Sequence, residues 1–344
     1  MHLTLVIPHL FWPDPDLPEI YQDLPLPALS WLLSRSTRQP QPLSADDWLA
    51  HTFGLPDQAT APISLQAEGC KPGQDYWLHA DPVHLQINRD QLILADSGIL
   101  SISQHEADQL IDSLNRHFAA DGLQFVAPYP SRWYVRCQTA PQITTKSVHR
   151  VIGQDIHRHL PVGADAMHWH QTLNEIQMLL YTHPVNDARD AAGDPLINSL
   201  WFWGGGIWQA PTTPAYDCCW ADPHLVSALV QTSGLRHEAL PATAAAWFEH
   251  AQQDRQWIWQ DALCGPAWYS DAHGWREALS RLEQDWFHPL KTALTQGRLA
   301  SLTIIAPEMG EFTLTPRAAW LFWKRTQSLA TWAPTQHAAQ VRSA

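Results

Sequence analysis

Hydrophobic positions recur at helical spacing over residues 168–181, and a short, continuous apolar run follows over 196–203. We expect a helix over the first segment. Pro184 is expected to end it, because a proline disfavours helical geometry in the residue before it. A polar turn is predicted over 186–195, and the apolar run then fits a buried strand that leads into the glycines 204–206.

These glycines are the first candidate for a ligand-facing loop. In open α/β sheets, ligands bind at the carboxyl ends of the strands, where loops bring backbone N–H groups close to an anion. Trp203 and Trp208 flank the run. We therefore place Trp203, Gly204 and Gly206 in a predicted ligand site.

A second pattern lies upstream. Residues 77–95 alternate or run apolar around a polar Asn-Arg-Asp turn and predict a β-hairpin. Ser103 and Glu106 form a capping box ahead of a helix. Two more strands are expected over 123–128 and 132–138. This order predicts a compact α+β unit.

The outer segments alternate between strand and helix and predict a parallel, helix-covered core. They include a long helix over 273–297, a late strand over 302–306 and a final helix over 317–332, whereas residues 55–75 are expected to be a loop. The fold class is α/β, a parallel sheet core flanked by helices with an inserted α+β domain. The predicted boundaries are 1–84 and 166–333 for the core, 85–165 for the insertion and 334–344 for a polar tail.

Composition narrows the function classes. The chain has 344 residues, 45% of them hydrophobic, and a formal net charge of −13. This charge argues against nucleic acid or an anionic membrane as a partner. The N-terminal MHLTLVIPHL lacks a basic region and predicts a strand rather than a signal peptide. Five cysteines without CxxC spacing are typical of a reduced compartment, so we expect a cytoplasmic location.

The residues alone are compatible with more than one kind of functional site. Arg189 could bind a carboxylate or phosphate, or could pair with Asp187 or Asp190 in a structural hinge. The acids and imidazoles available for a metal site are Asp81, His84, Asp222, His224 and His273. Histidines at 157, 159, 168 and 170 fit either a metal site or a polar surface.

Three motifs carry a family resemblance: ADPVHLQINRDQLILAD, HPVNDAR and INSLWFWGGG. They resemble the archaeal-type cofactor-independent phosphoglycerate mutases of the alkaline phosphatase superfamily. Over its whole length the chain resembles the proteobacterial RpfE-type regulatory proteins. The resemblance implies a parallel core sheet with an insertion near 85–165. It also implies two divalent metals, Mn²⁺ or Zn²⁺, a phosphoryl-accepting serine, and arginines of the insertion that hold phosphoglycerate.

The residues match this family only in part. Pro8 and His9 stand where the enzymes have an Asp-Gly metal motif, and residues 307–310 stand where they have Gly-Asp-His. The segment of the nucleophilic serine is missing, and the basic pair of the ligand loop reads Asp-Ser-Gly at 96–98. The matching positions are Arg132, His183, Asn186, Arg189, Asn198, Trp203, Gly204 and Gly206.

The leading hypothesis is therefore a phosphoglycerate mutase-like protein without metal or catalysis, which has a regulatory or ligand-binding role. Arg132 and Arg189 would hold a small phosphorylated or carboxylate ligand, unless the cleft receives a protein partner. The alternative is a metal-dependent phosphotransferase or phosphomutase that has rebuilt a Mn²⁺ or Zn²⁺ site from Asp81, His84, Asp222, His224 and His273.

Overall fold

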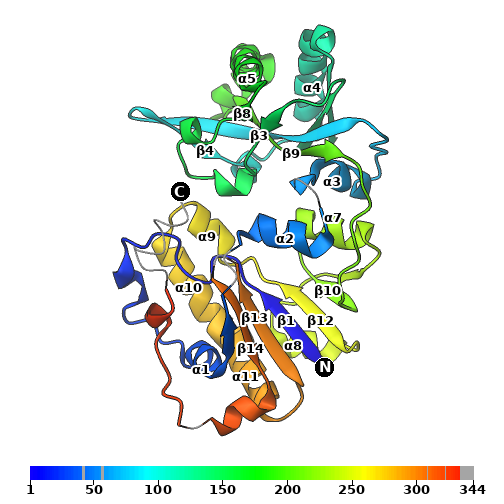
Figure 1. The fold of residues 1–344 in the computed structure, drawn as a ribbon. Coiled ribbons are helices and arrows are strands. Elements are labelled where there is room, and N and C mark those ends of the chain that lie inside the picture. Colours follow the sequence, from blue (N-terminus) through cyan, green and yellow to red (C-terminus); the bar gives the residue numbers. More distant parts are fainter. Residues whose placement is uncertain (41–42, 56–57, 308, 322, 334–344) are drawn as a thin grey trace. The chain divides into compact units, whose positions relative to one another are not determined.

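A computed structural model describes residues 1–344 apart from 41–42, 56–57, 308, 322 and 334–344. The predicted polar tail lies outside the described residues. The chain divides into two compact units: unit 1 comprises residues 1–53 and 213–344, and unit 2 comprises residues 54–212 (Figure 1). Among the described residues, none of the helices combines the length and the apolar character that a bilayer crossing demands.

Unit 1 is built on a seven-stranded sheet in the order β11-β10-β12-β1-β13-β14-β2. The five strands from β11 to β13 are parallel, and β14 and β2 add an antiparallel edge. The strands are β1 (His2–Val6), β2 (Thr37–Gln39), β10 (Cys218–Trp220), β11 (Arg236–Glu238), β12 (Arg255–Trp259), β13 (Ser301–Ala306) and β14 (Gly310–Leu314).

Helices pack against this sheet, and several of them share one apolar core with its strands. They are α1 (Pro27–Arg35), α2 (Ala45–Phe53), α7 (His224–Thr232), α8 (Ala244–His250), α9 (Cys264–Trp268), α10 (Ala272–Leu282) and α11 (His288–Thr295). The predicted long helix is interrupted by a π-helical turn over Glu283–Phe287. Within that turn, the buried Glu283 carboxylate accepts a hydrogen bond from the amide of Leu29 at 3.0 Å, in the first turn of α1.

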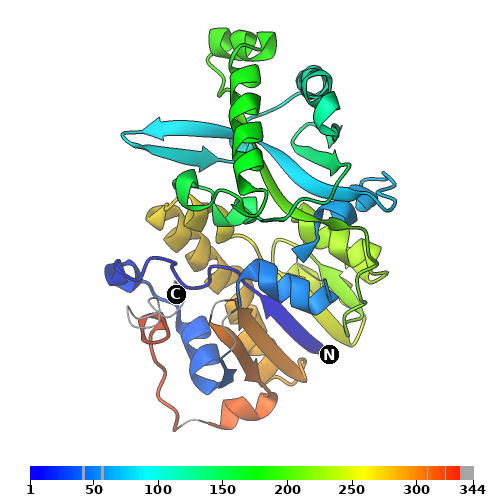
Figure 2. The ribbon, with the colours of Figure 1, turned by 45° about the horizontal axis from the view of Figure 1, so that its top comes forward.

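Unit 2 is built on an antiparallel sheet in the order β4-β3-β6-β5, and β9 pairs with β3. Its strands are β3 (Tyr76–Asn88), β4 (Gln91–Ala95), β5 (Leu123–Tyr129), β6 (Arg132–Cys137) and β9 (Ser199–Ile207), and the short β7 (Ile143–Thr144) pairs with β8 (Val162–Gly163). The far half of the β3–β4 hairpin extends away from the rest of unit 2 (Figures 1 and 2).

Helices cover both faces of this second sheet. Leu110 of α4 (Gln104–Phe118) and Ile176 of α5 (Ala166–Tyr181) pack in one core with Leu78 of β3. Leu65 of α3 (Ala61–Ala67) packs with Trp77 on the opposite face. Neighbouring residues of a strand point to opposite faces, which explains why Trp77 and Leu78 belong to different cores.

Unit 2, at residues 54–212, includes more of the chain than the predicted insertion at 85–165. The reason is β9, which pairs antiparallel with β3 along most of its length, from Val83–Ser199 to Tyr76–Ile207. The strand predicted for the parallel core therefore belongs to unit 2, and the glycines 204–206 lie inside it rather than in a loop after it. The expectation of a carboxyl-edge loop was wrong.

Three local predictions also differ from the structure. Residues 55–75 contain helix α3, and the predicted polar turn is helix α6 (Pro184–Ala192). Pro184 is the first residue of α6, a position that suits proline. His183 caps this helix, because its imidazole accepts a hydrogen bond from the amide of Val185 at 3.2 Å. In place of the final helix, the described residues form short 3₁₀ turns, over Pro316–Trp320 and Leu329–Thr331.

Candidate functional site

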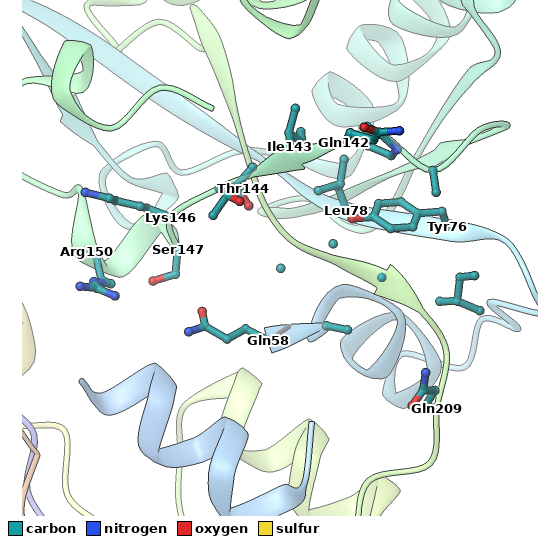
Figure 3. A pocket seen from close by; sticks show the side chains of 18 residues that line it. Gln58, Tyr76, Leu78, Gln142, Ile143, Thr144, Lys146, Ser147, Arg150 and Gln209 are labelled. Atoms are coloured by element: carbon teal, nitrogen blue, oxygen red, sulfur yellow. The ribbon is translucent and has the colours of Figure 1, made fainter. Parts of the chain in front are cut away.

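Unit 2 contains a cavity of about 860 Å³. Its lining residues come from four segments, 58–59, 76–78, 140–150 and 204–209, all within the same unit (Figure 3). A volume of this size is typical of small-molecule sites. We therefore take this cavity as the candidate functional site.

The charge of the cavity is opposite to that of the whole chain. Lys146 and Arg150 contribute to its lining, and no Asp or Glu is found among the described lining residues. Two cations in a lining whose described residues include no carboxylate attract an anion, although the formal net charge of the chain is −13. The ammonium of Lys146 also lies 3.2 Å from Nδ1 of His159. Burial, together with Lys146, lowers the pKa of His159, which keeps the ring neutral as an acceptor.

Local hydrogen bonds hold the cationic segment in place. At its start, the amide of Gln142 donates to the carboxylate of Asp165 at 2.7 Å. Further along, the carbonyl of Lys146 accepts a hydrogen bond from the indole of Trp201 at 2.8 Å. Because Trp201 belongs to β9, the backbone of Lys146 is tied to the strand that carries the glycines. The backbone that carries Lys146 is thus held by the sheet as well as by its own loop.

The glycines of β9 form a wall of the cavity, and each is required by close packing. Gly204 has a φ of +62°, and an added Cβ would lie 2.4 Å from Oγ1 of Thr60. A Cβ on Gly205 would lie 2.4 Å from the hydroxyl of Tyr76, and one on Gly206 would lie 2.3 Å from Cβ of Ala59. Glycine is therefore needed so that α3 and β3 can approach this wall.

Behind the wall lies a polar cluster centred on Trp203. Its indole nitrogen donates to Oδ2 of Asp81 at 2.6 Å, and its ring stacks on His79 with centroids 4.1 Å apart. His149 contacts the same ring edge-on at 5.7 Å. Burial raises the pKa of Asp81 to about 7, and the hydrogen bond from Trp203 opposes that increase. This aspartate therefore changes protonation near neutral pH.

Arg132, a predicted ligand residue, forms an ion pair with a buried carboxylate. Its Nε lies 2.5 Å from Oε1 of Glu68, whose side chain is 1% exposed, and its guanidinium stacks over the ring of Tyr129 at 4.0 Å. Burial, with a contribution from Glu68, raises the pKa of the neighbouring Tyr134 well above its usual range. Arg132 is absent from the described cavity lining.

Arg189 is buried, and protein groups surround its guanidinium. Nη1 lies 2.8 Å from Oε1 of Glu106, Nε donates to the carbonyl of Pro195 at 2.8 Å, and Nη2 donates to the carbonyl of Leu100. The structural alternative weighed for Arg189 is thus realised, but with Glu106 rather than Asp187 or Asp190. The guanidinium ties α6 to the start of α4.

The other predicted ligand residues also contact backbone. Asn186, 2% exposed, bonds with both the N–H and the C=O of Ile197, and Asn198 bonds in the same way with Leu85. His183 caps α6, and burial lowers its pKa. Of the predicted set, Gly204 and Gly206 line the cavity, and Trp203 stands directly behind it.

The alternative metal residues are divided between the units: Asp81 and His84 lie in unit 2, and Asp222, His224 and His273 lie in unit 1. Nδ1 of His84 lies 2.8 Å from the carbonyl of Leu196, and His273 pairs with Glu277. Within the described ranges, no group of three or more His, Cys, Asp or Glu side chains is arranged to hold a metal ion.

The core sheet offers few donors for the metals that the fold family implies. At the carboxyl ends of β10 and β12 stand Asp222 and Asp261, and burial and then Asp222 raise the pKa of Asp261. Among the described residues, neither aspartate belongs to a group of three or more His, Cys, Asp or Glu side chains that could hold a metal ion, and a pair of divalent ions needs more donors than that. The described residues at this edge therefore do not fit a dinuclear centre, and no chemical step is derived through one.

Sequence reasoning missed the cations and polar side chains of the cavity. Lys146 and Arg150 lie in QITTKSVHR, a stretch without clear periodicity that carries two of the chain's 21 Lys and Arg residues. Its local basic excess, in an acidic chain, was the available signal. Only the pairing of β9 with β3 places this stretch beside the glycines.

The amino-acid sequence is similar to known proteins over part of its length. Residues 74–186 match the family model of 2,3-bisphosphoglycerate-independent phosphoglycerate mutase. A probable enzyme of this name from Geobacter sulfurreducens is 27% identical over 193 residues, which cover 54% of this chain and 47% of that protein. One from Methanosarcina mazei is 29% identical over 150 residues, covering 40% and 36%. The matched segments thus span less than half the length of these relatives.

The fold is shared more widely than the sequence. The cofactor-independent phosphoglycerate mutase from Thermoplasma acidophilum superposes with a TM-score of 0.50 at 15% identity, over 97% of this chain and 95% of that one. The predicted alkaline-phosphatase-like α/β fold is confirmed by this likeness. In sequence, the chain is phosphoglycerate mutase-like over its middle part.

Proposed function

We propose that this protein is a non-catalytic relative of the phosphoglycerate mutases that binds a small phosphorylated or carboxylate ligand in the cavity of unit 2. The observation that carries the proposal is the lining, in which Lys146 and Arg150 stand beside a glycine wall without a carboxylate among the described lining residues. Cationic side chains that are not neutralised by a carboxylate of the same lining form the usual environment of a bound anion.

We further propose that the protein works without a bound metal, in a regulatory role like that of the RpfE-type proteins it resembles. Two-metal phosphoryl transfer needs cations on both the attacking and the leaving oxygen. The small donor set at the carboxyl edge of the core sheet supports a binding function over this chemistry.

Isothermal calorimetry with inorganic phosphate tests the binding site. We expect the double variant Lys146→Ala/Arg150→Ala to lose affinity by more than tenfold, since each charge-assisted hydrogen bond contributes on the order of 1.5–3 kcal/mol. Arg136→Ala is the matched control: its guanidinium is 41% exposed, pairs with Asp75 and belongs to the same unit. Equal affinity in the double variant and the control would remove the cavity as the anion site.

A second measurement tests the absence of catalysis. The protein, purified without chelator and supplied with Mn²⁺ or Zn²⁺, should not interconvert 2- and 3-phosphoglycerate or hydrolyse a phosphate ester above the metal-only background. Metal-dependent turnover that disappears in Asp222→Ala would establish the alternative, a phosphotransferase with a rebuilt metal site.

A further inference from the structure

Strand β9 lies at one edge of the sheet of unit 2. It pairs with β3 along one side, and no other strand of the described chain pairs with it. In an antiparallel pair, the backbone groups of alternate residues point away from the partner strand. Between Trp203 and Ile207, no backbone hydrogen bond joins β9 to any residue that the structure describes outside β3. The outer edge of β9 is therefore open to pairing with another extended chain.

The cavity lies along this open edge. A Cβ added to Gly204 or Gly206 would point toward the residues just before α3, whereas one added to Gly205 would point toward the hydroxyl of Tyr76. The three glycines thus face opposite sides of the sheet in turn, and yet all of them line the cavity. Because β3 occupies the inner edge of β9, a cavity that reaches both faces must extend past the outer edge.

The opposite wall of the cavity is formed by residues 142–147, which include the short strand β7. The two walls are joined by the hydrogen bond from the indole of Trp201 to the carbonyl of Lys146, at 2.8 Å. Figure 3 shows Lys146 and Arg150 together on one side of the cavity and Gln209, which follows β9, on the other. The cavity is therefore a groove between two segments of chain, with its cations on one side.

The size and lining of this groove suit a peptide better than a single ion. Its volume of about 860 Å³ exceeds by far the space that one ion fills, since a water molecule occupies about 30 Å³ of liquid. Besides the two cations, the lining includes the apolar side chains of Leu78, Ile143 and Ile207. Successive side chains of an extended peptide point to opposite sides. A peptide with alternating acidic and apolar residues therefore matches both kinds of lining.

We propose that the groove binds an extended acidic peptide segment, which adds a strand to the edge of β9 and places a Glu or Asp carboxylate at Lys146 and Arg150. Strand addition to an open sheet edge is a recurring mode of peptide recognition, in which main-chain hydrogen bonds supply affinity. The cations select acidic side chains, because the described lining residues include no carboxylate. This inference rests on the proposed anion-binding function and identifies the anion as the carboxylate of a peptide.

Isothermal calorimetry on the 344-residue chain tests this inference with a capped peptide, acetyl-Val-Glu-Val-Glu-Val-Glu-amide. Glutarate and inorganic phosphate are the free anions for comparison. We expect the peptide to bind at least roughly tenfold more tightly than either anion, because main-chain hydrogen bonds are added. A peptide with Lys in place of Glu should not bind. The double variant Lys146→Ala/Arg150→Ala should bind the acidic peptide at least roughly tenfold more weakly, whereas Arg136→Ala should bind it normally.

Two methylated peptides separate strand addition from binding by side chains alone. One carries backbone N-methyl groups at its first, third and fifth residues, and the other carries them at its second, fourth and sixth. Only one of the two keeps the N–H groups that face β9, because alternate N–H groups of a strand point to the same side. We expect their affinities to differ by at least roughly tenfold. The protein is identical in both titrations, so folding cannot cause the difference.

The outcomes distinguish this inference from the proposed anion site. Equal affinities of the two methylated peptides would overturn strand addition, and so would an acidic peptide that binds no more tightly than glutarate. Binding of inorganic phosphate that is lost in Lys146→Ala/Arg150→Ala would leave the anion site standing in either case. If neither the peptide nor inorganic phosphate binds, while circular dichroism shows a folded protein, both proposals are wrong.

Discussion

The indole nitrogen of Trp203 donates a hydrogen bond to the carboxylate of Asp81, 2.6 Å away, and so joins β9 to β3 directly behind the glycine wall. The two residues are separated by 122 positions in the sequence. The ring of Trp203 is held from a second side by stacking on His79. These contacts hold the backbone of β9 at the residue immediately before Gly204.

Asp81 gives the protein a pH-dependent stability that can be measured. Its pKa is about 7 in the folded protein, whereas an unfolded aspartate titrates near 4. The folded state therefore holds the extra proton between these values, and stability falls as the pH rises from about 4 to 7. Asp81→Asn should remove this loss. The free energy of unfolding of the wild type should fall between pH 5 and pH 8 by on the order of 2 kcal/mol more than that of the variant.

Urea denaturation at pH 5 and pH 8 checks this prediction. The groups that act on Asp81 besides Trp203 are Asp96, Glu68 and Arg132. Asp75→Asn is the control, because Asp75 is 48% exposed and pairs with Arg136 at the surface. An Asp81→Asn protein with the same pH dependence as the wild type would show that Asp81 does not titrate in this range.

Arg189→Ala should destabilise the protein without changing its affinity for phosphate. The side chain of Arg189 is 3% exposed, and its removal takes away the guanidinium donor to the carbonyls of Pro195 and Leu100 and the ion-pair partner of Glu106. We expect a loss of roughly 3–5 kcal/mol in the free energy of unfolding. Thermal denaturation and phosphate calorimetry provide the two readouts. A folded, stable variant with weakened phosphate binding would contradict this prediction and show that Arg189 binds the ligand.

Gly204→Ala should lower the free energy of unfolding by more than the replacement of a left-handed glycine by alanine usually does. The new Cβ would meet Oγ1 of Thr60 and Cδ2 of His79 at 2.4 and 2.9 Å, in addition to the strain at a φ of +62°. Gly193→Ala is the matched control, because its φ is +79° but no atom lies within 4 Å of the added Cβ. We expect about 1 kcal/mol for the control and at least about 2 kcal/mol for Gly204→Ala. Equal losses in urea denaturation would mean that the wall has room to relax.

Residues 54–212 should fold when expressed alone. Among the described residues, two buried apolar clusters of unit 2 draw on residues from 61 to 202, and a large cluster of unit 1 draws on the two outer segments. A unit with its own core and a complete sheet is expected to unfold cooperatively. Urea denaturation followed by tryptophan fluorescence tests this expectation. A broad transition with strong dye binding at low urea would show that unit 2 needs unit 1 to pack.

Several elements could be predicted because their signals are local. The capping box of Ser103 and Glu106 is present in full, with both reciprocal hydrogen bonds. The hairpin turn falls at Arg89, whose φ is +57°, between β3 and β4. Gly122 ends the following helical segment in the left-handed conformation. Each of these features depends on a few neighbouring residues, so a short window of sequence contains its cause.

The site could be predicted only in part. The glycines were recognised as unusual, and Gly204 and Gly206 do line the cavity. Arg132 and Arg189, however, have the same side-chain chemistry whether they meet a ligand or a carboxylate of the protein. Glu68 and Glu106 are far from them in sequence, and nothing in the local pattern reveals those pairs.

The amino-acid sequence by itself determined local turns and caps such as the Ser103–Glu106 capping box, the two kinds of sheet and the resemblance to the phosphoglycerate mutases. The tertiary structure alone decided that β9 pairs with β3 rather than joining the parallel core, and that Lys146 and Arg150 lie beside its glycines. The reason is physical. Hydrogen-bonded turns and caps form between neighbouring residues, whereas the partner of a buried strand is selected by which distant apolar surface covers it.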